Sequence, residues 1–248
     1  MTSIGKKGEK TDKNPDKIIE NITIGNVFFK VSAKLGEGSY GSVYRVSIDD
    51  SGKEYALKVI KNAAKEGIKS LRELDIMARI NHPNIAKAEM IVVDYIEKIT
   101  KKKKKIKYIT RIGILMEIAE KDLYKALFSK TFTPEKALDV LKQVCLGCKF
   151  LHESNYLHLD IKPLNILIYP NNIARITDFG LSLHTNEKRQ VSFPVKLMTI
   201  DHRSPNILKG GTEYSEADDV WSLGITFLDV LSKGKSLFSD FKKKRFHG

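Results

Sequence analysis

His158-Leu159-Asp160-Ile161-Lys162-Pro163-Leu164-Asn165 is followed, thirteen residues later, by Asp178-Phe179-Gly180. These two segments place two carboxylates, an amide and a lysine at short fixed spacings, between apolar runs that are typical of buried segments. Carboxylate and amide oxygens are the ligands that Mg²⁺ prefers in proteins. A lysine beside a carboxylate suits the transfer of a charged group to a hydroxyl, because it neutralises charge that develops during the transfer. The pattern indicates phosphoryl transfer, which also requires a segment that binds phosphates.

The candidate for that segment is Leu35-Gly36-Glu37-Gly38-Ser39-Tyr40-Gly41, followed by a β-prone run that begins at Val43. Glycine lets backbone N–H groups approach phosphate oxygens closely. The same glycine spacing opens dinucleotide-binding folds, but a helix follows the third glycine there, whereas a strand is predicted here. A strand, glycine loop and strand can close over a triphosphate. The loop taken alone leaves a second interpretation open, a glycine-rich hairpin that binds no ligand.

Lys58 lies in the apolar segment Ala56-Leu57-Lys58-Val59 of a predicted strand over residues 55–60. A buried lysine requires a counter-charge. Glu73, on a predicted helix over residues 67–80, is the candidate. A pair of this kind, taken alone, is more often a surface ion pair of little energetic value.

The charge of the chain is concentrated in two blocks. Of the net charge of +13, residues 98–111 carry +8 and residues 241–248 carry +4, which leaves +1 for the remainder. Such blocks are usually solvated loops or tails, although a nuclear-import signal or an acidic partner is the alternative. This distribution argues against a folded surface that binds nucleic acid.

Other features bear on the compartment of the protein. No apolar run is long enough to span a bilayer, so we expect no membrane association. Residues 1–20 contain no apolar segment of a secretory signal. Cys145 and Cys148 are too few for a disulfide framework and are expected to fill the core. An intracellular location, cytoplasmic or nuclear, is therefore expected.

The predicted elements change from strands to helices along the chain. Further strands are predicted over residues 27–31, 43–48, 91–96, 109–118, 166–169 and 173–176, and further helices over residues 122–129, 134–152 and 215–231. Strands with one helix, followed by mostly helices, indicate an α+β fold in two lobes. We predict a polar tail over residues 1–24, an antiparallel β-rich N-lobe over residues 25–118, a helical C-lobe over residues 119–240 and a basic tail over residues 241–248.

Taken together and in this order, these motifs resemble the eukaryotic-type serine/threonine protein kinases. The resemblance covers about residues 28–240 and is nearest to the cyclin-dependent group, on the glycine loop, Arg72-Glu73, His82-Pro83-Asn84-Ile85 and Asp219-Val220-Trp221-Ser222-Leu223-Gly224. It implies a two-lobed fold, ATP and Mg²⁺ as cofactors, and protein substrates. The residues before Arg72 lack the cyclin-binding sequence of that group, so we infer no cyclin.

The resemblance also implies a role for each site residue. Asp160 would accept the proton of the substrate hydroxyl, Lys162 would neutralise the γ-phosphoryl group, and Lys58, fixed by Glu73, would hold the α- and β-phosphates. Asn165 and Asp178 would bind Mg²⁺. The expected nucleotide-binding residues are Leu35, Gly36, Glu37, Gly38, Ser39, Tyr40, Gly41, Val43, Ala56, Lys58, Met116, Glu117, Ala119, Asn165, Leu167 and Asp178. Thr199 occupies the position of a threonine that contacts the aspartate and lysine in serine/threonine kinases. Asp219 is expected to anchor the backbone of the catalytic loop, and Trp221 is expected in the core.

Two departures from the family pattern concern control and completeness. Leu159 replaces the arginine that usually binds an activation-loop phosphate, so we expect activity not to depend on phosphorylation between Leu181 and Arg203. Asn206 replaces a glutamate that pairs with an arginine in the last C-lobe helices of the family, and the sequence stops at Gly248, before those helices. We therefore expect a shortened C-lobe, either adapted or belonging to a fragment.

Two functions remain open at this stage. The complete set Lys58, Glu73, Asp160, Asn165 and Asp178 favours an active serine/threonine kinase that transfers the γ-phosphate of ATP to proteins. The alternative is a pseudokinase, a nucleotide-binding or scaffolding module without phosphoryl transfer. The missing C-terminal helices favour this alternative.

Overall fold

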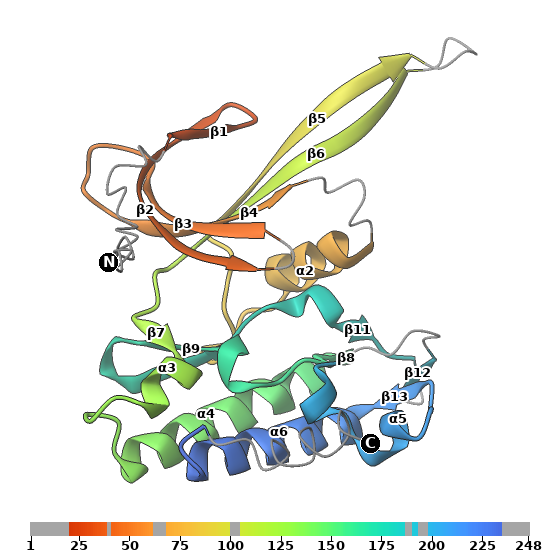
Figure 1. Ribbon diagram of the computed structural model, residues 1–248. Helices are drawn as coiled ribbons and strands as arrows, with labels where there is room; N and C mark the ends of the chain where they lie inside the picture. The colour runs from red at the N-terminus through yellow and green to blue at the C-terminus, as the bar shows by residue number, and fades with distance from the viewer. Residues whose placement is uncertain are drawn as a thin grey trace, which may run out of the picture.

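The computed structural model of the chain has two lobes, one rich in strands and one mainly helical (Figure 1). It describes residues 20–38, 41–61, 68–99, 105–186, 190–192 and 198–234. Among these residues, none of the helices combines the length and the apolar character that crossing a bilayer demands. The α+β fold in two lobes that the sequence predicts is confirmed.

The N-lobe is one antiparallel sheet with the strand order β1-β2-β3-β4-β6-β5. Its strands are β1 (Ile22–Ile24), β2 (Val27–Gly38), β3 (Gly41–Ser47), β4 (Tyr55–Lys61), β5 (Met90–Ile99) and β6 (Lys105–Met116). The helix α2 (Ile68–Arg79) lies on the side of the sheet that faces the C-lobe (Figure 1).

The C-lobe is built mainly on two long helices that pack against each other, α4 and α6. Thr133 caps α4 through its side chain, followed by Pro134 at the first helical position, as the sequence predicts. The helices are α3 (Leu123–Leu127), α4 (Pro134–Glu153), α5 (Pro205–Leu208) and α6 (Glu216–Leu231). The short strands are β7 (Lys121–Asp122), β8 (Tyr156–Leu157), β9 (Ile166–Tyr169), β10 (Ile173–Ile176), β11 (Leu183–His184), β12 (Gln190–Ser192) and β13 (Glu213–Ser215).

One hydrophobic core runs through both lobes. Ile76 of α2 and Ile112 of β6 belong to the same buried cluster as Val144 of α4 and Ile176 of β10. The buried aromatic ring of Phe179 also belongs to this cluster. A second cluster, which includes Phe29 and Leu57, covers the opposite face of the N-lobe sheet. The lobes are therefore joined by packed side chains as well as by the chain itself.

Three predictions about the fold need correction. Residues 22–24, predicted as part of a tail, form β1, because Ile22 to Ile24 pair with Val27 to Phe29 across a tight turn. The strands predicted over residues 91–96 and 109–118 are longer on the side of their connection, because their pairing continues to Ile99 and Lys105. The hairpin of β5 and β6 extends beyond the rest of the sheet (Figure 1). Trp221 is 38% exposed, since it lies on the outer face of α6 and not in the core. Residues 1–19 of the first predicted tail and the whole of the second lie outside the described residues.

At Gly147, α4 lies close to the backbone of Asn84, in the segment between α2 and β5. A Cβ at this position would lie 2.7 Å from the carbonyl oxygen of Asn84, which already accepts a hydrogen bond from the backbone N–H of Ile176. We expect Gly147→Ala to lower the free energy of unfolding by about 1–3 kcal/mol, because the backbone around Asn84 must shift.

Gly224, in the middle of α6, is the matched control because nothing lies within 4 Å of the Cβ that alanine would add. Gly224→Ala is expected to be neutral or to stabilise by up to about 1 kcal/mol, the difference in helix propensity. Urea denaturation of the two variants measures both values. Equal effects of the two substitutions would contradict the packing assigned to Gly147.

Candidate active site

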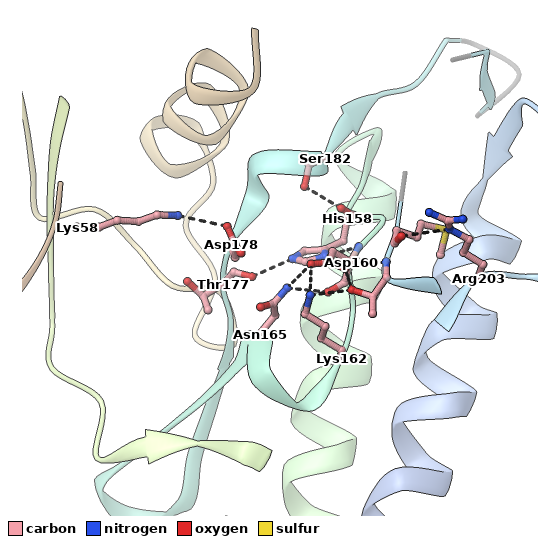
Figure 2. Close-up of polar contacts among 11 residues, drawn as sticks. Lys58, His158, Asp160, Lys162, Asn165, Thr177, Asp178, Ser182 and Arg203 are labelled. Atoms are coloured by element: carbon pink, nitrogen blue, oxygen red, sulfur yellow. Dashed lines mark hydrogen bonds and ion pairs between the residues drawn. The ribbon is translucent and has the colours of Figure 1, made fainter. Parts of the chain in front are cut away.

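Lys58 joins the two lobes at the back of the cleft. Its ammonium lies 2.5 Å from a carboxylate oxygen of Glu73 on α2. It also lies 3.2 Å from Oδ1 of Asp178, which follows β10, and Figure 2 shows this second contact. Three residues that are far apart in the sequence therefore meet at one point. The side chain of Glu73 is almost fully buried, whereas that of Asp178 is partly accessible.

The charges of these three groups depend on one another. Burial alone would lower the pKa of Lys58, but Glu73 and Asp178 outweigh it and raise this pKa above its usual value. Burial raises the pKa of Glu73, and the Lys58 ammonium opposes that shift. For Asp178, burial would raise the pKa, but Lys58 holds it below its usual value. Asp178 is therefore an ionised carboxylate, and its oxygens could ligate a cation.

Asp160 accepts hydrogen bonds from three side chains. Lys162 Nζ lies 2.6 Å and Asn165 Nδ2 2.8 Å from Oδ2 of Asp160, and the hydroxyl of Thr199 donates to Oδ1 over 2.6 Å. Lys162 also donates to the Thr199 hydroxyl, over 2.8 Å. Figure 2 shows Lys162 and Asn165 converging on Asp160. The contacts that the resemblance implies for Thr199 are therefore present.

The orientation of Asn165 matters for a cation. Its amide nitrogen donates both to the carbonyl oxygen of Asp160, over 2.9 Å, and to the Asp160 carboxylate. Because the nitrogen is used in both bonds, the amide oxygen is the atom left to ligate a metal. Asn165 and Asp178 thus supply oxygen donors from the two segments that border the cleft, a set that suits Mg²⁺.

The segment His158–Asn165, which we call the catalytic loop, is held by hydrogen bonds to α6. The buried carboxylate of Asp219 accepts the backbone N–H groups of His158 and Leu159, each over 2.7 Å, and Nε2 of His152 lies 2.9 Å from it. The anchoring role predicted for Asp219 is confirmed. His152 was not predicted to take part. Its spacing of four residues from Cys148 on α4 shows only that the two share a helix face.

His158 orders the loop from within, a role that the sequence analysis did not assign. Its Nδ1 accepts the backbone N–H of Asp160 over 3.2 Å, which leaves Nε2–H to donate to the carbonyl oxygen of Thr177 over 3.1 Å. Its ring also packs edge-on against Phe179, with 5.2 Å between centroids. His158 therefore links the segment of Asp160 to the segment of Asp178.

Four of the predicted nucleotide-binding residues of the N-lobe share one face of the sheet. Val43 pairs with Lys58 across β3 and β4, and Ala56 pairs with Met116 across β4 and β6. Residues paired in this way point to the same side, and Ala56 and Lys58 lie two residues apart. Leu167 lies on β9 of the C-lobe, across the cleft. The side chains of four residues thus point to the same side of the N-lobe sheet: Val43, Ala56, Lys58 and Met116.

The glycine segment forms the hairpin between β2 and β3. Gly36, Glu37 and Gly38 pair with Val43, Ser42 and Gly41. A Cβ at Gly41 would lie 2.2 Å from the carbonyl oxygen of Val59, so only glycine fits there. Leu35 is partly exposed on β2. Ser39 and Tyr40 lie outside the described residues.

Glu117 and Ala119 follow β6, in the segment that connects the lobes. The carboxylate of Glu117 lies 2.6 Å from a guanidinium nitrogen of Arg175 on β10. Arg175 also donates to the carbonyl oxygen of Pro83 over 3.2 Å and stacks on Tyr169. The sequence analysis did not identify Arg175, because no local pattern distinguishes it.

Leu159, which replaces the usual arginine, is fully buried. It packs against residues of the segment between Leu181 and Arg203, which we call the activation segment. It adopts a left-handed backbone, with φ of 63°, and packs in an apolar cluster. The other members of that cluster are Leu157, Leu183, Met198, Ile207 and Tyr214. The place of a phosphate-binding arginine is therefore taken by a hydrophobic contact. Thr185, within this segment, is buried and donates its hydroxyl to the carbonyl oxygen of Asn155 over 3.2 Å.

Comparison with known proteins agrees with this geometry. Residues 29–247 match the family described as "Protein kinase domain", and the chain belongs to that family. It is 34% identical over 216 residues to Cell division control protein 2 homolog 3 of Trypanosoma brucei brucei, covering 82% of this chain and 62% of that protein. It is 31% identical over 221 residues to Mitogen-activated protein kinase 13 of Arabidopsis thaliana, covering 85% and 58% respectively.

A third relative is Cyclin-dependent kinase 12 of Drosophila melanogaster, which is 33% identical over 211 residues, or 83% of this chain and 18% of that protein. The chain spans less than two thirds of the length of each of these relatives. The resemblance to serine/threonine kinases of the cyclin-dependent group, predicted from the motifs, is confirmed.

Restoring the usual arginine at residue 159 is expected to destabilise this chain. Leu159→Arg would bury a guanidinium among apolar side chains, and we expect a loss of several kcal/mol of unfolding free energy. Leu159→Met, which conserves volume, is expected to cost less than about 1.5 kcal/mol. Thermal and urea unfolding compare the two variants. A Leu159→Arg variant as stable as the wild type would refute the apolar anchoring of the activation segment.

Proposed function

We propose that the chain is a protein serine/threonine kinase, which transfers the γ-phosphate of ATP to hydroxyl groups of proteins. The observation that carries this proposal is the cluster of Lys162, Asn165 and Thr199 around the Asp160 carboxylate. A carboxylate that only stabilised the fold would not need a lysine, an amide and a hydroxyl gathered around it in this way.

Asp160 is the group that orients the substrate hydroxyl and accepts its proton. Its Oδ1 is held by Thr199 and its Oδ2 by Lys162 and Asn165, so the carboxylate cannot rotate freely. A general base held in one orientation speeds the reaction in two ways. It is already placed for the substrate hydroxyl, and it accepts the proton as the phosphoryl group is transferred.

Lys162 and Lys58 act on the phosphates. Lys162 uses two of its three N–H donors on Asp160 and Thr199, and the third is left for the γ-phosphoryl group. Lys58 lies on the face of β4 that borders the cleft and would hold the α- and β-phosphates while Glu73 keeps it in place.

Magnesium held by the oxygens of Asp178 and Asn165 would neutralise phosphate charge during the transfer. Burial would raise the pKa of Asp178, but the Lys58 ammonium outweighs burial and keeps this pKa low. Asp178 suits the role because its carboxylate therefore stays ionised. Its backbone is left-handed, with φ of 68°, a conformation that turns the side chain into the cleft beside the buried Phe179.

The choice of serine and threonine as acceptors rests on Lys162 and Thr199. Both stand beside Asp160 and leave an acceptor site bordered by a hydroxyl and an ammonium. The family resemblance assigns this pair to serine/threonine kinases. We infer protein substrates on the same ground. We infer no cyclin, because the residues before Arg72 lack the cyclin-binding sequence of the cyclin-dependent group.

Transfer of the γ-phosphate to a generic protein substrate tests the proposal. We expect Asp160→Asn to lower the transfer rate by roughly 10²–10⁴-fold, because the general base is lost, while Mg²⁺-ATP still binds. Asp49→Asn, in an exposed turn of the N-lobe, is the control and should transfer at the wild-type rate. Radiolabelled ATP measures transfer, and calorimetry measures nucleotide binding.

Two outcomes would overturn the proposal. If neither the wild type nor Asp160→Asn transfers phosphate, but both bind Mg²⁺-ATP, the chain is a nucleotide-binding module without transferase activity. If neither protein binds the nucleotide, the cleft has only a structural or scaffolding role.

A further inference from the structure

The position of α2 decides whether the site is assembled, because Glu73 on this helix keeps Lys58 in place. A helix that can swing outward would break this ion pair. Within the part of the chain that the structure describes, α2 packs on the 3₁₀ turn Phe179–Leu181, which follows Asp178. It also makes a polar contact with the C-lobe.

That contact is a hydrogen bond from the hydroxyl of Tyr156 to Oδ2 of Asp75, over 3.1 Å. Asp75 lies two residues after Glu73 on α2, so the two carboxylates leave the helix about 200° apart. Glu73 turns to the N-lobe sheet while Asp75 turns to the C-lobe. One helix is thus held at two different faces.

Tyr156 is well placed to act as the fixed partner. It lies on β8, two residues before His158, and its side chain belongs to the core cluster shared by the lobes. It pairs with His184 across β8 and β11, and the two rings meet edge-on with 5.0 Å between centroids. The phenol therefore lies where β8, β11 and α2 come together. Figure 1 shows α2 above β8 and β11.

The charges of the two groups suit a lasting bond. Arg79, one turn further along α2, forms an ion pair with Asp75 and, as the main cause, holds the pKa of Asp75 low. Burial, and then the Asp75 carboxylate, raise the pKa of Tyr156, so the phenol remains a donor. Hydrogen bonds to an ionised acceptor are stronger than those between neutral groups.

We propose that the Tyr156–Asp75 hydrogen bond is a built-in latch that keeps α2 in the position where Glu73 holds Lys58, without help from a second protein. Tyr156 and Asp75 are positioning residues, since neither touches the reacting groups. This inference rests on the proposed kinase activity for its kinetic readout, but its structural readout is independent of that activity.

Tyr156→Phe tests the latch because it removes the hydroxyl and keeps the packed ring. We expect kcat to fall about ten-fold, the change that about 1.4 kcal/mol in barrier height produces, with the KM for the protein substrate unchanged. Amide hydrogen exchange in α2 should become faster by a similar factor. Tyr124→Phe, on the exposed surface of α3, is the matched control and should change neither quantity.

A double-mutant cycle separates the latch from other effects. Asp75→Ala should cause the same loss as Tyr156→Phe, and the double variant should lose no more than either single variant. Arg79→Ala removes the exposed ion pair on α2 and keeps the latch, so it should have a smaller effect.

Unchanged α2 exchange in Tyr156→Phe, or additive losses in the cycle, would overturn the latch. Absence of transfer by the wild type would overturn the proposed function alone, because hydrogen exchange still reports on α2.

Discussion

The buried carboxylate of Asp219 is the constraint on which the rest of the site depends. A carboxylate with no exposure to water needs hydrogen-bond partners, and Asp219 has them in His152 and in the backbone N–H groups of His158 and Leu159. These bonds fasten the catalytic loop to the long helix α6. These bonds set the position of the loop relative to α6 and so the position of Asp160, around which Lys162, Asn165 and Thr199 gather.

The second organising contact joins the lobes. Lys58 forms ion pairs with Glu73 of the N-lobe and with Asp178 of the C-lobe. Its ammonium therefore holds together α2 and the segment that follows β10. The continuous core between α2 and the C-lobe supports this arrangement. The activation segment is held by apolar packing on Leu159 where the family usually uses charge. The site is thus organised by contacts within one chain.

Much of this was predictable from local sequence. The two strands after Asn165 and the start of α4 at Pro134 follow from apolar runs and capping signals, and their bounds agree with the structure. Motif spacing identified Asp160 and Lys58 because kinase chemistry needs those groups. Trp221 was misplaced, since periodicity does not tell which face of a helix a neighbour covers. The bond of Tyr156 to α2 was not predictable, because it depends on how distant elements pack.

The central claim is that the site is complete in the single, unmodified chain. The most direct measurement is the rate of γ-phosphate transfer by chain that mass spectrometry shows to carry no phosphate, assayed without any added protein except the substrate. The account predicts a constant rate of transfer from the first time point, without a lag. Adding an upstream kinase should not increase this rate. Transfer that begins only after phosphorylation of the segment between Leu181 and Arg203, or only with a second protein bound, would contradict it.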